Sequence, residues 1–336
     1  MKELSNVTAT ALTVGETGAG QRVDNFLLRH LKGVPASHIY RILRSGEVRV
    51  NRGRVDPQRR LEVGDVLRIP PIRVASREAG RAAREPARAG HGGSPGTRPV
   101  AGRTPRLRSP VLYEDDALLV VDKPSGLAVH GGSGVALGLI ERLRFERPQA
   151  SFLELVHRLD RDTSGVLVIA KKRQALTGLH AQLREGRVDK RYSVLVRGAW
   201  PQGRRVVSAP LHKFSTREGE RRVRVDAEGR DAITVFRRER SFARHDPPLA
   251  LLEAELATGR THQIRVHVAH AGHALAGDDK YGDFAWNREL ARAGLGRMFL
   301  HARRIGFAHP IDGSRIDVEA PLPADLRAFL ASLDGG

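Results

Sequence analysis

The stretch "HRLDRDTSG" at residues 157–165 follows directly after the apolar run "FLELV". It places a histidine, two arginines, two aspartates, a threonine and a serine within nine residues. An apolar run that ends in such a cluster is typical of a strand followed by a loop. The cluster is either a solvated turn or part of a reactive site, and the rest of the chain has to distinguish the two.

The charge balance predicts affinity for a polyanion. Lys and Arg number 57 against 38 Asp and Glu, which gives the 336-residue chain a net charge of +19. A GC-rich genome would favour arginine over lysine, but such a bias does not create a surplus of positive charge. We therefore expect a partner such as RNA, DNA or an anionic membrane. The length suits about two domains of ordinary size.

Several classes of protein are excluded or disfavoured. The chain has no cysteine, which rules out disulfides, thiolate zinc sites and a cysteine nucleophile. Its N-terminus, "MKELSNVTATALTVGETGAG", lacks the basic start and apolar core of a signal peptide. No uncharged apolar run approaches the ~20 residues that span a bilayer. We expect a soluble, cytoplasmic protein that does not act in a membrane.

The composition divides the chain into regions. Residues 75–109 contain eight Arg, two Glu, many Gly, Pro and Ala, and few large aliphatic residues. Such a segment cannot bury enough apolar area to offset the entropy of ordering it, so we expect a disordered basic linker. It is either a plain tether or a segment that follows a phosphate backbone. Residues 1–19 are expected to be an N-terminal extension.

Residues 20–72 read as a small folded unit. "VDNFLLRHL" and "PASHIYRILRSG" have the apolar spacing of two helices, the second with Ser37 as its candidate N-cap, and short strands with turns at "NRG" and "VGD" follow. This order, with "SGEVRVNRGRV" after "IYRIL", resembles the S4 RNA-binding domain. A basic face suited to backbone phosphates is expected from five arginines, with a surface that binds nothing as the alternative: Arg41, Arg44, Arg49, Arg52 and Arg54.

Residues 110–331 read as an α+β domain. Strand patterns in "VLYEDDALLVVDKPSG", "KRYSVLVRGAW", "ITVFRRERSF" and "LLEAELATG" surround a helical pattern in "KKRQALTGLHAQLREG". Because the elements do not alternate strand and helix regularly, we expect a mixed, largely antiparallel sheet flanked by helices. "QIRVHV" at 263–268 is also expected to be a strand.

Common catalytic and metal-binding signatures are absent from the sequence. It contains no G-x-x-x-x-G-K-[ST], H-E-x-x-H or G-x-S-x-G pattern. His267, His270 and His273 are three apart, but no carboxylate or thiolate lies at ligand spacing, so we expect no metal. In a strand over 263–268, Arg265 would point toward a pocket and need an anion, for which Asp160 is a candidate. The pair is either catalytic or a buried tie between two segments.

The sequence resembles the RluA-type family of RNA pseudouridine synthases from about residue 110 almost to its end. The blocks that carry the resemblance occur in order: "HRLDRDTSG" at 157–165, "KRYSVLV" at 190–196, "TGRTHQIRVH" at 258–267, "GDDKYG" at 277–282 and "LHARRIGFAHP" at 300–310. An S4 domain in front of this domain is a familiar arrangement in the family. "GLAVHGGSG" at 126–134 is similar to the type-C branch, which by analogy implies several separated uridines of 23S rRNA, free or in an assembly intermediate, as substrate. The long linker departs from that branch.

The resemblance implies roles for individual residues. Asp160 would be the catalytic carboxylate, either attacking the ribose or removing a sugar proton. Arg265 would keep Asp160 ionised, Tyr192 would stack on the uracil, and Arg158 would hold the rearranged RNA. No cofactor is implied. The alternatives are a non-catalytic RNA-binding or assembly factor, and a glycosidase or nucleosidase with Asp162 as its second carboxylate.

Overall fold

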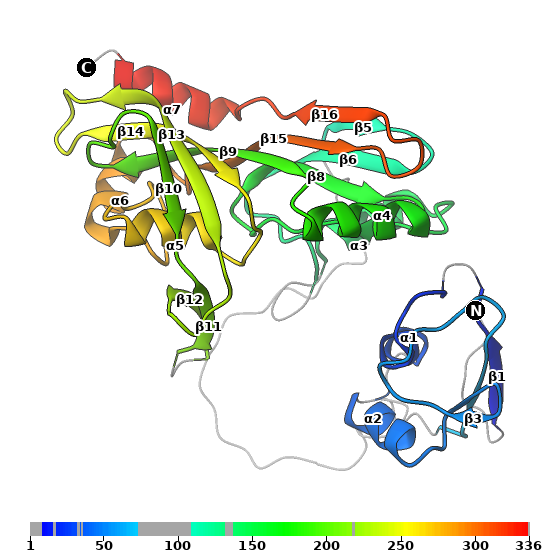
Figure 1. The fold of residues 1–336 in the computed structure, drawn as a ribbon. Helices are drawn as coiled ribbons and strands as arrows, with labels where there is room; N and C mark the ends of the chain where they lie inside the picture. The colour runs from blue at the N-terminus through cyan, green and yellow to red at the C-terminus, as the bar shows by residue number, and fades with distance from the viewer. Residues whose placement is uncertain are drawn as a thin grey trace, which may run out of the picture. The chain divides into compact units, whose positions relative to one another are not determined.

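The computed structural model describes residues 9–15, 18–31, 34, 36–72, 109–131, 137–216 and 219–334. The chain divides into two compact units, within residues 1–103 and 104–336 (Figure 1). Apart from Ser109, the expected linker 75–109 lies outside the described residues. Among the described helices, none combines the length and the apolarity needed to cross a bilayer.

The first unit packs two helices on a small sheet. Its elements are β1 (Thr10–Thr13), α1 (Val23–His30), α2 (Ala36–Arg44), β2 (Arg49–Val50), β3 (Gly53–Arg54) and β4 (Val66–Ile69). The strand order is β1-β4-β2-β3. The segment 1–19, which we expected to be an extension, thus contributes β1, whose four residues pair antiparallel with β4. Apolar residues from both helices and the sheet share one core.

The helix ends and turns of this unit follow local chemistry. Asn51 and Arg52 both have positive φ, 49° and 69°, as a two-residue turn between antiparallel strands requires, and they join β2 to β3. Gly46 has φ of 76° and closes α2. At the other end, α2 begins at Ala36, so the expectation that Ser37 is its N-cap was wrong: Ser37 lies within the first turn.

The second unit is built on a mixed sheet. Its strands are β5 (Val111–Glu114), β6 (Leu118–Lys123), β7 (Glu154–Leu155), β8 (Ser164–Ala170), β9 (Asp189–Arg197), β10 (Arg204–Ser208), β13 (Ile233–Phe242), β14 (Leu249–Leu256), β15 (Leu300–Ala308) and β16 (Arg315–Glu319). The main order is β10-β13-β14-β9-β15-β8-β6-β5, with β16 paired to β15 and β7 paired to β8. Within the described sheet only β15 and β8 run parallel. This confirms the predicted α+β, largely antiparallel architecture.

Helices cover both faces of the sheet: α3 (Leu139–Glu146), α4 (Arg173–Arg184), α5 (Gln263–His270), α6 (Phe284–Arg292) and α7 (Ala324–Asp334). Side chains that alternate along a strand enter different cores, as on β6, where Leu119 and Val121 face one core and Leu118 and Val120 another. The first of these cores also takes apolar residues of α3 and α5. The far face is covered by α4 at β6 and β8, and by α6 and α7 at β9 and β14. The last helix runs past residue 331, the expected domain end.

The stretch "QIRVHV" is helical, so the prediction of a strand there was wrong. It forms the start of α5, which begins after His262, a residue with left-handed φ of 54°. Ile264 and Val268, four apart, enter the same core, as one helical face requires. β-Branched residues gave the stretch strand-like chemistry, but its tertiary packing overrides that preference. A strand would have placed Gln263, Arg265 and His267 on one face, and the helix does not.

A two-stranded hairpin projects from the body of this unit. It consists of β11 (Leu211–Ser215) and β12 (Arg221–Val225), and Figure 1 shows it below α5, away from the main sheet. Its second strand is held by the backbone N–H of Val223, which donates to the hydroxyl of Tyr281 at 2.9 Å, and the turn before that strand by an ion pair between Glu220 and Lys280. The hairpin is thus connected to the segment that follows α5.

Candidate active site

One cavity of about 520 Å³ in the second unit is lined by all four residues singled out there, Arg158, Asp160, Tyr192 and Arg265. They come from three separate stretches: the loop between β7 and β8, the strand β9, and the first turn of α5. The cavity also receives the loop 257–262, which leads into α5. The fold therefore brings together residues that are more than a hundred positions apart in the sequence.

Asp160 lies on a loop whose backbone is held by hydrogen bonds from buried groups. Its carbonyl accepts a hydrogen bond from the backbone N–H of Thr163 at 3.2 Å. The fully buried Lys123 donates to the carbonyl of the next residue, Arg161, at 2.9 Å, and to the carbonyls of Pro124 and Leu127 at 2.8 Å each. Burial lowers the pKa of Lys123 to about 7. These contacts fix the backbone that carries the Asp160 carboxylate.

Arg265 pairs with two carboxylates inside the protein. Asp160 was expected from the sequence, and Asp278 was not. Nη1 of Arg265 lies 3.6 Å from Oδ2 of Asp160. Its Nε and Nη2 donate to Oδ2 and Oδ1 of the fully buried Asp278 at 2.7 and 2.5 Å. Burial alone would raise the pKa of Asp278, but its hydrogen bonds with Arg265 hold that pKa below its usual value. Arg265 is therefore a fixed cation that both neutralises Asp278 and faces Asp160.

His262 is a further neighbour of Asp160 that sequence reasoning did not single out. Its Nε2 lies 3.7 Å from Oδ2 of Asp160, and its Nδ1 lies 2.8 Å from the hydroxyl of Tyr281. That hydroxyl already accepts from Val223, so its own proton is available to Nδ1. The proton of a neutral His262 then sits on Nε2, which faces Asp160. Burial lowers the pKa of His262, which favours this neutral form.

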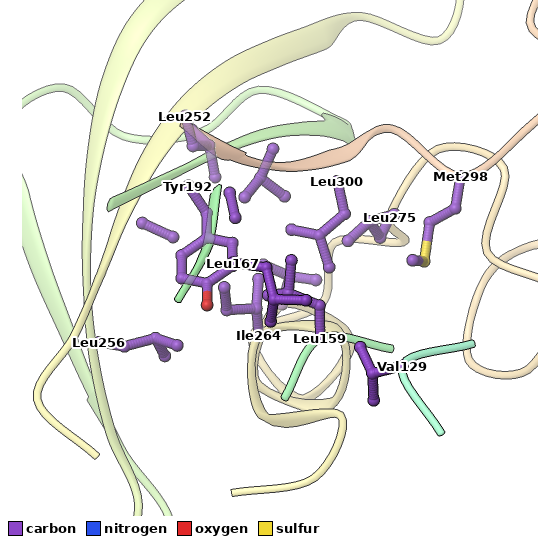
Figure 2. Close-up of a cluster of buried hydrophobic side chains, with 14 of the residues drawn as sticks. Val129, Leu159, Leu167, Tyr192, Leu252, Leu256, Ile264, Leu275, Met298 and Leu300 are labelled. Atoms are coloured by element: carbon purple, nitrogen blue, oxygen red, sulfur yellow. The ribbon is translucent and has the colours of Figure 1, made fainter. Parts of the chain in front are cut away.

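Tyr192 closes the apolar side of the cavity. Its ring belongs to the core cluster shown in Figure 2, where it lies among Leu167, Leu256 and Ile264, and it is 8% exposed. Burial, and then the nearby charge of Asp160, raise the pKa of the phenol above its usual value, so the group is neutral near pH 7. An aromatic face beside a carboxylate suits a flat, uncharged ring such as a nucleobase.

The other residues of "HRLDRDTSG" mostly build the loop. Nε2 of His157 accepts from the backbone N–H of Val168 at 3.2 Å, and burial lowers the His157 pKa to about 4. Asp162 pairs with its neighbour Arg161 at 3.1 Å and lies outside the lining of the cavity. Ser164 accepts from Nη2 of Arg297 at 2.7 Å and contacts His301 at 3.0 Å. Of this stretch, the exposed Arg158 and the half-buried Asp160 offer charged groups to the cavity.

The spaced histidines 267, 270 and 273 do not converge. The buried ring of His267 contacts Thr234 at 2.9 Å through Nδ1 and the carbonyl of Ala209 at 3.1 Å through Nε2. His273 contacts the carbonyl of Arg197 at 2.9 Å instead. Within the described ranges, no three His, Asp or Glu side chains form a group that could hold a metal ion.

The five arginines expected to bind RNA in the first unit are all exposed but divide into two sets. Arg49 and Arg52 line a hollow of about 760 Å³, which Arg68 also lines. Arg41, Arg44 and Arg54 lie outside that hollow: Arg41 pairs with Glu47 at 3.2 Å, and Arg54 donates to the carbonyl of Arg44 at 3.1 Å. Arg68 alternates with buried residues along β4 and was not singled out from the sequence.

Comparisons with known proteins agree on both units. A sequence model described as RNA pseudouridylate synthase matches residues 117–270, and one described as S4 domain matches residues 21–67. The chain is 51% identical over 333 residues to "Ribosomal large subunit pseudouridine synthase C" of Escherichia coli (strain K12), covering 98% of both chains. It is 47% identical over 335 residues to the protein of the same name from Pasteurella multocida (strain Pm70), covering 99% of this chain and 96% of the relative.

Two solved structures share the fold of about two thirds of this chain. Human RNA Pseudouridylate Synthase Domain Containing 1 superposes with a TM-score of 0.55 at 25% identity, covering 70% of this chain and 98% of the human chain. Human RNA Pseudouridylate Synthase Domain Containing 4 gives 0.53, also at 25% identity, with 67% and 92% covered. The fold and the sequence therefore lead to the same family.

Proposed function

The chain belongs to the RNA pseudouridylate synthase family, and on that premise we propose that it converts uridines of 23S rRNA to pseudouridine with Asp160 as the catalytic carboxylate. The observation that carries this proposal is the position of Asp160, 3.6 Å from the buried Arg265, in a cavity that Tyr192 closes on its apolar side. Several separated uridines of the large subunit are the proposed targets. With ribosomal RNA as the proposed substrate, we propose the cytoplasm as the place where the protein acts.

The reaction breaks the bond between N1 of uracil and C1′ of ribose and joins C5 to C1′ after the base turns. Asp160 either attacks C1′ or removes a proton from the sugar, and both roles need an ionised carboxylate close to the ribose. Arg265 supplies an opposite charge that is fixed by Asp278 and therefore cannot turn away. The net reaction consumes no redox equivalent and no phosphoryl group, so residues of this chain suffice for each step named here.

The uracil ring is proposed to lie against Tyr192 while it detaches and turns. A uridine must leave its helix or loop to reach this cavity, at a cost of a few kcal/mol. Arg158 is exposed at the same cavity, where its planar guanidinium is suited to stacking in the space that the uridine leaves. Arg49, Arg52 and Arg68 are proposed to bind phosphates of the same RNA through the first unit.

A glycosidase-like cleavage is less well supported, because it needs a second carboxylate as general acid. Asp160 is the one carboxylate among the described residues that line the cavity, and Asp162 pairs with Arg161 outside it. Release of free uracil from RNA would nevertheless indicate that chemistry. We expect none.

Mapping of pseudouridine in 23S rRNA from cells with and without the protein tests the proposal. We expect specific sites to disappear without the protein and to return with the wild type but not with Asp160→Asn. Asp162→Asn is the matched control, since it changes a carboxylate two residues away that does not line the cavity, and it should restore the sites. An unchanged map without the protein, or full activity of Asp160→Asn, would refute the proposal.

A further inference from the structure

Two lysines are buried among the described residues, and their surroundings differ sharply. Lys123 is met by three backbone carbonyls. Lys190, which is 9% exposed, lines the cavity that contains Asp160. Within the described part of the chain, no carboxylate or carbonyl oxygen lies within hydrogen-bond or ion-pair distance of its Nζ. The side chain is thus mostly removed from solvent, and its ammonium reaches only the cavity, where a ligand could provide the missing partner.

The position of Lys190 directs it to the substrate. Lys190 and Tyr192 are two apart on β9, so both side chains project from the same face of the strand, ~7 Å apart along it. The Lys190 ammonium lies beside Gly259, whose missing side chain leaves room: a Cβ there would be 3.7 Å from Nζ. Tyr192, labelled in Figure 2, lines the cavity at the proposed base site, and Lys190 lines the same cavity two residues earlier on β9.

The cavity as a whole has more positive than negative charge. Arg158, Arg184 and Arg260 line it together with Lys190, against the single carboxylate of Asp160. Arg265, the remaining cation of the lining, is already neutralised by Asp278. A ligand that matches this balance must bring its own negative charge. Burial, and then the charge of Arg260, lower the pKa of Lys190, and a bound anion would reverse that effect.

We propose that Lys190 binds a phosphodiester that flanks the target uridine, and so forms a phosphate subsite next to the base site at Tyr192. The inference rests on the proposed function, because RNA is the substrate that brings an anion into this cavity. Uracil and ribose are uncharged, so the phosphodiester is the group of the substrate that carries a charge opposite to that of Lys190. Anchoring the nucleotide at its phosphate while the base is detached would keep the ribose in place beside Asp160.

The test compares Lys190→Met in the full chain with the wild type on a synthetic RNA that contains one mapped target uridine. We expect KM and the dissociation constant to rise roughly tenfold to a hundredfold, because a charge-assisted hydrogen bond is lost, while kcat changes much less. The slope of log affinity against log salt should become shallower by about 0.7. Lys172→Met, at an exposed lysine outside the cavity, should change neither value.

Two further measurements separate substrate binding from a structural role. Lys190→Met should unfold at an equal or higher temperature than the wild type, since it replaces a mostly buried lysine, whose ammonium has no protein partner among the described residues, with an apolar group. In RNAs with a neutral methylphosphonate at either flanking position, the wild type should lose affinity at one of them, and there Lys190→Met should cost nothing more.

The outcomes distinguish the two proposals. If the wild type forms no pseudouridine in the unmodified RNA, the proposed function fails and this inference fails with it. If the wild type is active but Lys190→Met has the same KM, or if its defect is equally large on both methylphosphonate RNAs, the phosphate subsite alone is refuted.

Discussion

Arg265 holds Asp278 with two short hydrogen bonds, at 2.7 and 2.5 Å, while its third nitrogen lies 3.6 Å from Asp160. The arginine is thus oriented by one carboxylate in order to face another. Asp278 is fully buried, and its Oδ1 also accepts from the backbone N–H of Lys280 at 2.8 Å. Asp278 therefore orients Arg265, and Asp160 is the carboxylate whose charge Arg265 stabilises.

Asp278→Asn should therefore be more damaging than its conservative character suggests. It removes the charge of the one fully buried carboxylate that binds Arg265, and leaves only the more distant Asp160 and the exposed Asp279 as charged partners. Breaking a buried pair in this way costs about 3–5 kcal/mol. Asp279→Asn is the matched control, because Asp279 also contacts Nη2 of Arg265, at 3.2 Å, but is 61% exposed. Urea unfolding should show a large loss for Asp278→Asn and less than about 1 kcal/mol for Asp279→Asn. Equal losses would mean that burial of the pair does not matter.

Much of the second unit could be predicted because the pattern of apolar residues within each element indicates its secondary structure. The alternation in β6 and the apolar spacing of α4 reflect which side chains each element buries, so pattern and structure agree. The helix α5 could not be predicted in the same way. "QIRVHV" is too short and too rich in β-branched residues for its helical period to stand out. What fixes its start is tertiary: the Gln263 side chain accepts from Thr258 and from the backbone N–H of Arg260.

The residues of the candidate site could likewise be predicted only in part from the sequence. Asp160, Arg265 and Tyr192 were found through ordered motifs, and the structure places all three at one cavity. Asp278 lies in "GDDKYG", one of the blocks that resemble the family, but its role depends on a contact with Arg265 that the sequence does not reveal. His262 was passed over because its significance comes from the left-handed backbone that aims it at Asp160. Pairings of this kind follow from the assembled fold.

Tyr281→Phe should disturb His262 without touching the carboxylate of Asp160. The tyrosine hydroxyl lies 2.8 Å from Nδ1 of His262, and removing it takes away the donor that places the histidine proton on Nε2. We expect the ¹⁵N chemical shifts of the His262 ring to change toward a mixture of tautomers, and kcat to fall by about fivefold, the size of one neutral hydrogen bond. Tyr113→Phe removes a tyrosine hydrogen bond outside the cavity, to Asp115 at 2.6 Å, and should leave both readings unchanged. Unaltered ¹⁵N shifts of His262 in Tyr281→Phe would show that the Tyr281 hydroxyl does not set the tautomer of His262.

Acid should destabilise the second unit through two histidines whose pKa values are lowered in the folded protein. Burial lowers the pKa of both His157 and His301 to about 4, from 6.5. Between these values the unfolded chain binds more protons than the folded chain. The unfolding free energy therefore falls as the pH drops from 6.5 to 4, by at most about 1.4 kcal/mol per pH unit for each histidine.

Glutamine at position 157 keeps an acceptor for the backbone N–H of Val168 but cannot be protonated. Urea unfolding at a series of pH values should show a shallower decline for His157→Gln than for the wild type. His301→Asn, which keeps an acceptor for the hydroxyl of Ser164, should have a similar effect. His212→Gln, at an exposed position, should follow the wild-type curve. A wild-type curve that is flat from pH 6.5 to 4 would contradict the burial argument.

Gly165, the last residue of "HRLDRDTSG", couples the catalytic loop to the sheet. It has φ of 112° and pairs with Ala302 where β8 and β15 run parallel, and an added Cβ would lie 2.2 Å from the Ala302 carbonyl oxygen. Gly165→Ala must force these strands apart, whereas Gly186→Ala at φ of 69° meets nothing within 4 Å. Gly186→Ala should cost about 1–2 kcal/mol of unfolding free energy, the strain of a left-handed backbone alone. Gly165→Ala should cost clearly more.

The activity of the two glycine variants should diverge further than their stability. Displacing β8 at Gly165 moves the loop that carries Asp160, and a shift of about 1 Å at a catalytic group can cost a hundredfold in rate. Measured at a temperature where both variants remain folded, kcat/KM should therefore fall by roughly that factor in Gly165→Ala and stay near the wild-type value in Gly186→Ala. If the two variants lost equal activity and equal stability, the close contact between β8 and β15 would not be what positions Asp160.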